Sequence, residues 1–455
     1  MKKHIFVSLA ALLACGCSLS LFGPARPYPS PILMPGTTPE MQSPGYWVSL
    51  SPGPDKPAMT REEITKFNTL VSDGLKARTD IFTASPFFSK WTLISNFENT
   101  LKTYQSANLF YASGKKVPSV FYYKVGGNIN ASEILYDGVN QYGFVVKTAS
   151  LRALPIKQSM YRTRGDTEAD ALLKCTLDIG APLIVQHETF DKKWYYVLTE
   201  YYSGWIEADN AVLCELQDVK DFLSKSPFCV VTSAKADVFL DEEMSGFYGT
   251  ASMGTRLPTG TKSTEDAVNV VAPYRDKEGK MIFGDLFIRR NSIHQGYLPY
   301  TPRSIINEAF EYINQPYGSN GIYSFTDNQT FVAKVFSTTG VFLPVSYSST
   351  TALGDAIAAF GEDIPRRQRF DSLTNSVPGG VTLLFTDDNA YIYLGAVKGA
   401  PYTIREIWTY KQFIKNTTSH DISLKRAVVT DLLLEDKTSA GALIDRLISA
   451  RIVKN

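Results

Sequence analysis

The sequence has almost no excess of charge of either sign. Its 455 residues include 46 Lys and Arg against 45 Asp and Glu, which gives a formal net charge of +1 at pH 7. Proteins that bind nucleic acid through its phosphates concentrate basic residues on their surface. We therefore expect no nucleic-acid partner.

Histidine is scarce, and no cysteine pair has the spacing of metal ligands. Structural zinc sites need clusters such as Cys-x-x-Cys or closely spaced histidines, and the sequence contains neither. We expect neither a metal site nor a bound cofactor. The four histidines are scattered along the chain, at His4, His187, His294 and His420.

Cysteine is also scarce, and the five cysteines fall into two groups. Cys15 and Cys17 end the N-terminal apolar segment, so only Cys175, Cys214 and Cys229 remain downstream. In an oxidising compartment three cysteines form at most one disulfide. The sequence does not decide which two would pair.

The N-terminal apolar run, residues 5–14, is too short to cross a bilayer as a helix. Lys2 and Lys3 precede it and small residues lead up to Cys15, an order typical of a secretion signal. It resembles the lipoprotein signal, in which the first cysteine of the mature chain is acylated. We expect residues 1–17 to act as this signal, with acylation at Cys15 holding a secreted protein on a membrane, facing the periplasm or the cell surface. Acylation at Cys17 and an ordinary cleaved signal are the alternatives.

A chain of this length is expected to form two to four domains. Residues 18–57 are rich in proline and predict an extended tether. Thr60 and Glu63 then have the spacing of a capping box, and apolar residues follow at helical intervals. We therefore predict a helical N-terminal region over residues 58–136.

Short alternating strands predict a small β-barrel over residues 137–222. The run 148–155, the strand 194–197 and the sequence Tyr202-Ser203-Gly204-Trp205-Ile206 resemble the opening strand and the late Gly-Trp strand of bacterial SH3-like domains. Residues 223–298 predict a second module of this kind, although fewer of its residues match.

From about residue 299 the pattern becomes helical and then returns to strands. Thr301-Pro302 predicts a helix start, and the segments 382–385 and 391–394 predict strands. This order predicts an α+β domain over residues 299–425, followed by a helical tail over 426–455. The predicted fold class is thus multidomain α+β, with a helical N-terminal segment, one or two SH3-like β-barrels and a final α+β domain.

Three positions of the final domain point to a family. Residues 327–332 read Asp-Asn-Gln-Thr-Phe-Val, residues 387–395 read Asp-Asp-Asn-Ala-Tyr-Ile-Tyr-Leu-Gly, and Arg405 lies ten residues beyond. The segments resemble those of the NlpC-type, papain-like cysteine peptidases, whose catalytic cysteine, histidine and third polar residue fall on Asn328, Asn389 and Arg405. The resemblance implies a papain-like α+β fold and a murein peptide as ligand.

All three catalytic residues are replaced by residues that cannot perform their chemistry. Cysteine peptidases need a thiolate, an imidazole that exchanges protons, and a group that orients the ring. Asparagine supplies neither a nucleophile nor a titrating group, and a guanidinium is permanently charged and accepts no hydrogen bond. We therefore predict that the chain is not an enzyme.

The loss of catalysis leaves a groove that we expect to bind a ligand. The candidate residues are Asn328, Asn389, Arg405, Asp327 and Ser346, the last at a position where the resemblance implies an aspartate. Arg405 would bind a carboxylate if its charge is not neutralised by Asp327 and Glu406.

We accordingly predict a non-catalytic envelope lipoprotein that binds a murein-derived peptide or an envelope protein. An active γ-D-glutamyl-diamino acid endopeptidase and a purely structural scaffold are the alternatives.

Overall fold

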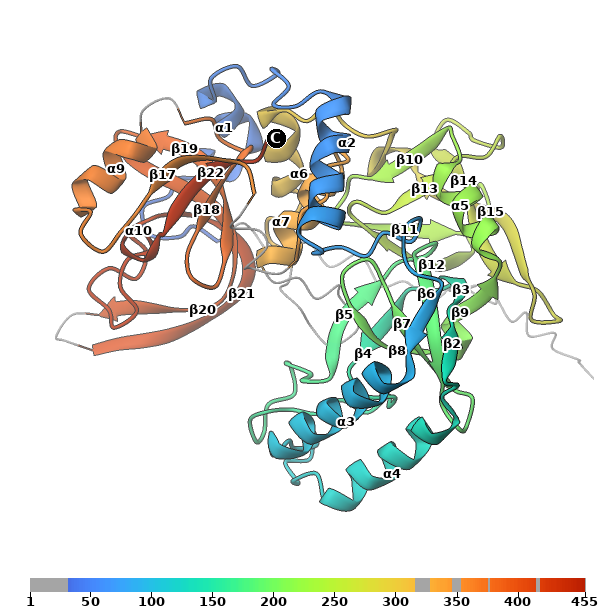
Figure 1. Cartoon of the computed structure of the whole chain (residues 1–455). Coiled ribbons are helices and arrows are strands. Elements are labelled where there is room, and N and C mark those ends of the chain that lie inside the picture. The colour runs from blue at the N-terminus through green and yellow to red at the C-terminus, as the bar shows by residue number, and fades with distance from the viewer. Residues whose placement is uncertain (1–31, 316–327, 346–352, 375–376, 415–417, 455) are drawn as a thin grey trace, which may run out of the picture.

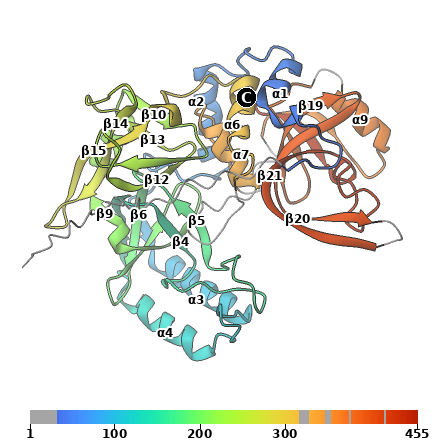
Figure 2. The same ribbon diagram turned by 180° about the vertical axis from the view of Figure 1, so that it is seen from behind.

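The computed structural model describes residues 32–315, 328–345, 353–374, 377–414 and 418–454. Helices α6 (Pro302–Phe310) and α7 (Asn328–Ser337) lie between the C-terminal sheet and the β-sheets of the middle of the chain (Figure 1). The view from behind in Figure 2 shows the same order. None of the described helices is long and apolar enough to cross a membrane.

The first described segment packs against the last domain. Helix α1 (Pro44–Leu50) carries Trp47, which is 0% exposed and donates its indole N–H to the carbonyl of Met41 over 2.8 Å. Tyr402 of the last domain donates its hydroxyl hydrogen to the Gly36 carbonyl over 2.8 Å. The prediction of a tether over residues 18–57 is therefore wrong for residues 32–57, because apolar residues among the prolines find a core to enter.

Helix α2 (Arg61–Thr69) is also fixed to the last domain. Thr60 and Glu63 form the reciprocal hydrogen bonds of a capping box at its start. Arg61 donates to the carbonyls of Leu298 and Thr339 over 2.8 and 2.7 Å. A π-helical turn, Leu70–Gly74, follows.

Two further helices cover the first β-unit. α3 (Lys90–Ser106) begins at Ser89, whose hydroxyl accepts the Thr92 N–H, and α4 (Ser119–Ile129) ends where Asn130 adopts a left-handed backbone with φ of 57°. Their apolar faces pack on Trp194 and Trp205, which are core residues. Strands β1 (Phe87–Ser89) and β2 (Asp137–Val139) pair beside them.

The first β-unit is a seven-stranded antiparallel sheet in the order β5-β4-β8-β7-β6-β3-β9. Because β5 and β9 lie at the edges of this sheet, its hydrogen bonds do not close it into the small β-barrel that we predicted for residues 137–222. Helix α5 (Leu216–Ser224) follows it. The strands are β3 (Gln141–Val145), β4 (Ala149–Arg152), β5 (Leu173–Leu177), β6 (Pro182–Glu188), β7 (Trp194–Leu198), β8 (Ser203–Glu207) and β9 (Ala211–Cys214).

The second β-unit has two small antiparallel sheets, in the orders β13-β10-β16 and β12-β11-β15-β14. Its buried residues share one core with Phe144 and Val212 of the first unit, so the two units pack together. The strands are β10 (Phe228–Val231), β11 (Lys235–Phe239), β12 (Phe247–Ser252), β13 (Arg256–Pro258), β14 (Ala267–Arg275), β15 (Met281–Arg289) and β16 (Ile293–Gln295).

The last domain places α6 and α7 on one face of a six-stranded antiparallel sheet, in the order β17-β22-β18-β19-β20-β21. Helices α9 (Arg366–Thr374) and α10 (Leu443–Arg446) cover the other face. The predicted helical tail over residues 426–455 is wrong, because this segment supplies the end of β21 and the whole of β22. The strands are β17 (Asp355–Ala359), β18 (Thr382–Phe385), β19 (Ala390–Val397), β20 (Ala400–Ile414), β21 (Thr418–Asp431) and β22 (Ser449–Ile452).

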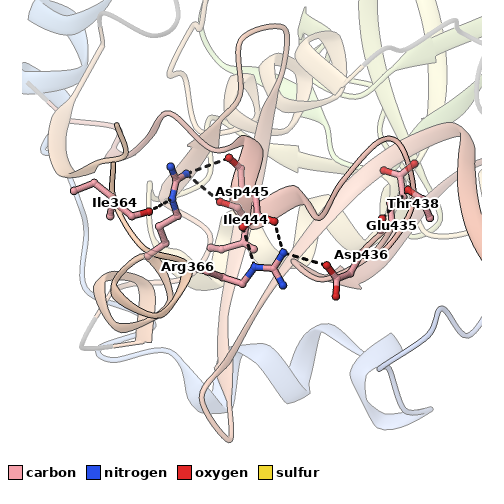
Figure 3. Close-up of polar contacts among 8 residues, drawn as sticks. Ile364, Arg366, Glu435, Asp436, Thr438, Ile444 and Asp445 are labelled. Atoms are coloured by element: carbon pink, nitrogen blue, oxygen red, sulfur yellow. Dashed lines mark hydrogen bonds and ion pairs between the residues drawn. The ribbon is translucent and has the colours of Figure 1, made fainter. Parts of the chain in front are cut away.

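Two arginines hold α9 and α10 together. Arg366 lies beside Asp436 and Asp445 (Figure 3), with its Nε 2.9 Å from the Asp445 carboxylate. Arg369 is 5% exposed and donates to the carbonyls of residues 361, 364, 444, 445 and 447. Its buried charge is thus solvated by backbone.

Candidate functional site

Two of the predicted site positions lie where α7 meets the β18–β19 hairpin. Asn328 is the first residue of α7, and Asn389 closes the hairpin by exchanging hydrogen bonds with Thr386. Gln329 donates its side-chain amide to the Asp388 carbonyl over 3.3 Å, which links the first turn of α7 to the hairpin. The structure therefore brings the helix and hairpin together. Asp327 and Ser346 lie outside the described residues.

Arg405 lies on the opposite face of the sheet from α7. Its neighbour Ile404 pairs with Ile392 of β19, and both pack in the core that contains α7. Because side chains alternate along a strand, Arg405 points the other way, and its guanidinium carbon lies 5.5 Å from the ring centre of Tyr391. Tyr391 belongs to the α9–α10 core.

The prediction that Arg405 lines the groove is therefore wrong. The residue is 4% exposed, its Nε donates to Thr430 Oγ1 over 3.2 Å, and its Nη2 has no hydrogen-bond partner among the described residues. Burial lowers the pKa of Arg405. A side chain held this way cannot reach a ligand beside α7.

A buried glutamate, Glu308 of α6, lies on the face of the sheet opposite Arg405. Glu308 and Tyr312 lie one turn apart on and just after α6, and the charge of Glu406, from β20, raises the pKa of the Tyr312 hydroxyl further than burial alone. Glu308 Oε2 and the Tyr312 hydroxyl have no hydrogen-bond partner among the described residues. Burial and the charge of Glu311 raise the pKa of Glu308 to about 8. Our sequence analysis missed this buried acid. The signal for it was the position of Glu308, at the margin of the predicted apolar stripe Ile305-Ile306-Ala309.

We expect Glu308→Gln to stabilise the fold at neutral and higher pH. Below about pH 4.5 the Glu308 carboxyl carries its proton in both the folded and the unfolded state. Between about pH 4.5 and pH 8 only the folded state keeps this proton. Stability therefore falls as pH rises through this window. The free energy of unfolding, measured with denaturant at pH 5 and pH 8, should fall less between these pH values in Glu308→Gln than in the natural chain. The expected difference is about 1–3 kcal/mol. Glu98→Gln, exposed on α3, is the control; equal losses in all three proteins would contradict the assignment.

A cavity of about 440 Å³ lies on the side of α7 that faces the β-units. Thr330, Ala333, Lys334 and Ser337 line it from α7. The first β-unit contributes the turns around residues 175–184 and 198–202, and the second contributes residues 252–256. The wall also includes residues 78–82, Leu223, Tyr297, Phe342 and Val345.

A chain of polar contacts joins all three parts at this cavity. Asp178 of the first unit accepts the backbone N–H of Ser252 over 2.9 Å and also binds the Ser252 hydroxyl. Lys334 of α7 donates to the same hydroxyl over 2.8 Å. Also on the cavity wall, Arg78 pairs with Glu200, and its guanidinium carbon lies 4.3 Å from the ring centre of Phe342.

Cys175 reaches the cavity wall. Burial raises the pKa of its thiol to about 12, so the thiol stays protonated at neutral pH. No histidine lines the cavity in the described part of the chain, and His187 instead binds the Ile129 carbonyl under α3 and α4. Cys214 and Cys229 are also free, with pKa values raised to about 12 by burial. No histidine in the described part of the chain is therefore placed to activate a thiol here.

No group of three or more His, Cys, Asp or Glu side chains that could hold a metal ion occurs among the residues that the structure describes.

The arrangement of α6 and α7 against the antiparallel sheet, with β-units packed beside α7, is the fold of the NlpC/P60 endopeptidases, and the chain carries an SH3 domain of the SH3b1 type. The SH3 family model matches residues 159–207. An NlpC/P60 endopeptidase from Photobacterium damselae subsp. piscicida is similar over 89% of this chain and 96% of its own, with a TM-score of 0.68 and 17% identity. An NlpC/P60 family protein from Bacillus cereus ATCC 10987 covers 68% of this chain and 98% of its own, with a TM-score of 0.46 and 16% identity. No curated protein matches the sequence.

Proposed function

We propose that this chain is a catalytically inactive NlpC-type homologue of the cell envelope that binds a murein-derived peptide in the cavity beside α7. The observation that carries the proposal is the chemistry of the two positions where α7 meets the β18–β19 hairpin. Both are asparagines, Asn328 and Asn389.

Asparagine fails at both positions for different reasons. At the start of α7 it offers no nucleophile, although a helix N-terminus would favour a thiolate. On the hairpin its amide neither takes nor gives a proton near neutral pH, so no general base is supplied. The third position, Arg405, lies on the other face of the sheet.

The cavity supports binding as the retained activity. Its volume is within the usual range for small-molecule sites, and it combines apolar walls with a few polar groups. Murein peptides carry carboxylates and short aliphatic groups that suit such a site. An envelope protein that inserts a short segment into the cavity is the alternative partner.

We expect no hydrolysis of a murein tripeptide by the natural chain, and none by Asn328→Cys. A thiol at 328 would still have no imidazole to generate its thiolate or to protonate the leaving amine. Product release measured by chromatography tests both proteins, with an active NlpC/P60 endopeptidase as the control. Turnover by the natural chain would establish the active-endopeptidase alternative, and the absence of both turnover and binding would favour the scaffold alternative.

We further propose that the protein is held on a membrane through an acylated Cys15, which lies outside the described residues. Cys15→Ser should move the protein from the membrane fraction to the soluble fraction and abolish palmitate labelling, while Cys17→Ser should do neither. Labelling that survives Cys15→Ser would place the acylation elsewhere.

A further inference from the structure

We infer that Lys334 binds the carboxylate of the ligand, and that the ligand's aliphatic body fills the cavity beside α7. The inference rests on the proposed function, because it names the chemistry of the ligand at the same site. Three observations about the cavity's charges carry it.

The first observation is that Lys334 has donors to spare. It lies on the cavity face of α7 with Thr330 and Ser337, one turn to either side. An ammonium has three N–H donors, and the Lys334 ammonium makes one hydrogen bond, to Ser252, among the described residues. Among the described residues, no carboxylate oxygen lies within 4.0 Å of the Lys334 ammonium, so no ion pair neutralises its charge in that part of the chain.

The second observation is that the other cations of the wall are occupied. Arg78 is paired with Glu200 and stacked on Phe342. Arg256 donates to the carbonyls of Phe222 and Lys225 and lies 4.1 Å from the ring centre of Phe228. Neither guanidinium can turn to a ligand without breaking these contacts.

The third observation concerns the acid nearest to Lys334 in the polar chain. Asp178 directs both carboxylate oxygens to the backbone N–H and hydroxyl of Ser252. It therefore fixes Ser252 and leaves the ammonium of Lys334 available. A second carboxylate, brought by a ligand, would complete the site.

The other residues of the cavity wall indicate which kind of ligand carries the carboxylate. A single ammonium in an apolar setting suits one carboxylate better than a phosphate, which usually needs several donors. The C-terminus of a short aliphatic peptide and the head of a medium-chain fatty acid share this chemistry. The apolar wall residues include Leu177, Ile184, Leu198, Met253 and Val345.

Calorimetric titration with paired probes tests the inference. The tripeptide Ala-Ala-Leu is compared with its C-terminal amide, and decanoate is compared with decanamide. We expect the natural chain to bind at least one acid tenfold or more tightly than its amide. Lys334→Met, which keeps an unbranched side chain without the charge, should lose that preference and bind acid and amide alike.

Two further variants separate charge from structure. Ser252→Ala removes the hydrogen bond to Lys334 but keeps its ammonium, so the preference for the acid should remain. Lys102→Met, exposed on α3, should behave as the natural chain does. The peptide pair and the fatty-acid pair distinguish the two sources of the carboxylate.

Equal affinity for acid and amide in the natural chain would overturn the role of Lys334 while leaving a peptide-binding cavity in place. A preference for the acid that survives Lys334→Met would move the carboxylate site to another residue. If neither these probes nor a murein tripeptide binds, both this inference and the proposed function fail.

Discussion

Replacing Arg369 with alanine is expected to lower the free energy of unfolding of the last domain by about 3–5 kcal/mol. The guanidinium donates to five backbone carbonyls, two from the segment before α9 and three from residues 444–447 around the end of α10. Truncation leaves these buried acceptors without donors and opens a hole beneath Phe360, whose ring centre lies 5.4 Å from the guanidinium carbon. Urea unfolding followed by circular dichroism measures the loss.

The chain offers a matched control two residues earlier. Arg367 lies on the same helix, but its side chain is 94% exposed, and its ion pair with Asp371 is long, at 4.0 Å. Arg367→Ala should change stability by no more than about 0.5 kcal/mol. Comparable losses in the two variants would show that the buried carbonyls do not depend on Arg369.

Filling the cavity with Leu198→Trp is expected to weaken the binding of a murein tripeptide at least tenfold. Leu198 ends β7 and lines the cavity from the first β-unit, so an indole there takes the space of the ligand. Calorimetry gives the affinity, and thermal unfolding shows whether the fold tolerates the larger side chain.

Leu240→Trp is the control for this prediction, because Leu240 is 53% exposed on the second β-unit and does not line the cavity. It should bind the tripeptide as the natural chain does. Unchanged affinity in Leu198→Trp, with the fold intact, would place the ligand outside the cavity.

Local signals in the sequence located several elements correctly. The capping box at Thr60 and Glu63 and the Thr301-Pro302 helix start are both present in the structure, because each depends on hydrogen bonds within four residues. The resemblance to the NlpC-type peptidases placed Asn328 before an apolar helix and Asn389 before a strand, and the two residues begin α7 and precede β19.

Features that depend on distant contacts were not predictable in this way. The resemblance placed Arg405 at the third catalytic position, but the face of the sheet on which its side chain lies depends on the register of β20 with β19. A shift of one residue reverses every side chain. The segment after residue 426 pairs with β18 and β20, and a short apolar run does not distinguish such a strand from a helix. The cavity forms only where three parts of the chain pack together. No local sequence pattern could therefore predict that Lys334 lines it.

The burial of Trp47 in the last domain has a consequence for how the protein is made. Met41, Trp47, Ile64 and Phe67 share one core with residues that begin at Tyr300 and end at Val453. The ribosome therefore produces the first part of this core more than two hundred residues before most of its partners. Until the C-terminus emerges, these side chains stay exposed to proteases and to other unfolded chains, as is usual for contacts of large sequence separation. This domain therefore closes last, once segments from both ends of the chain are available to its core.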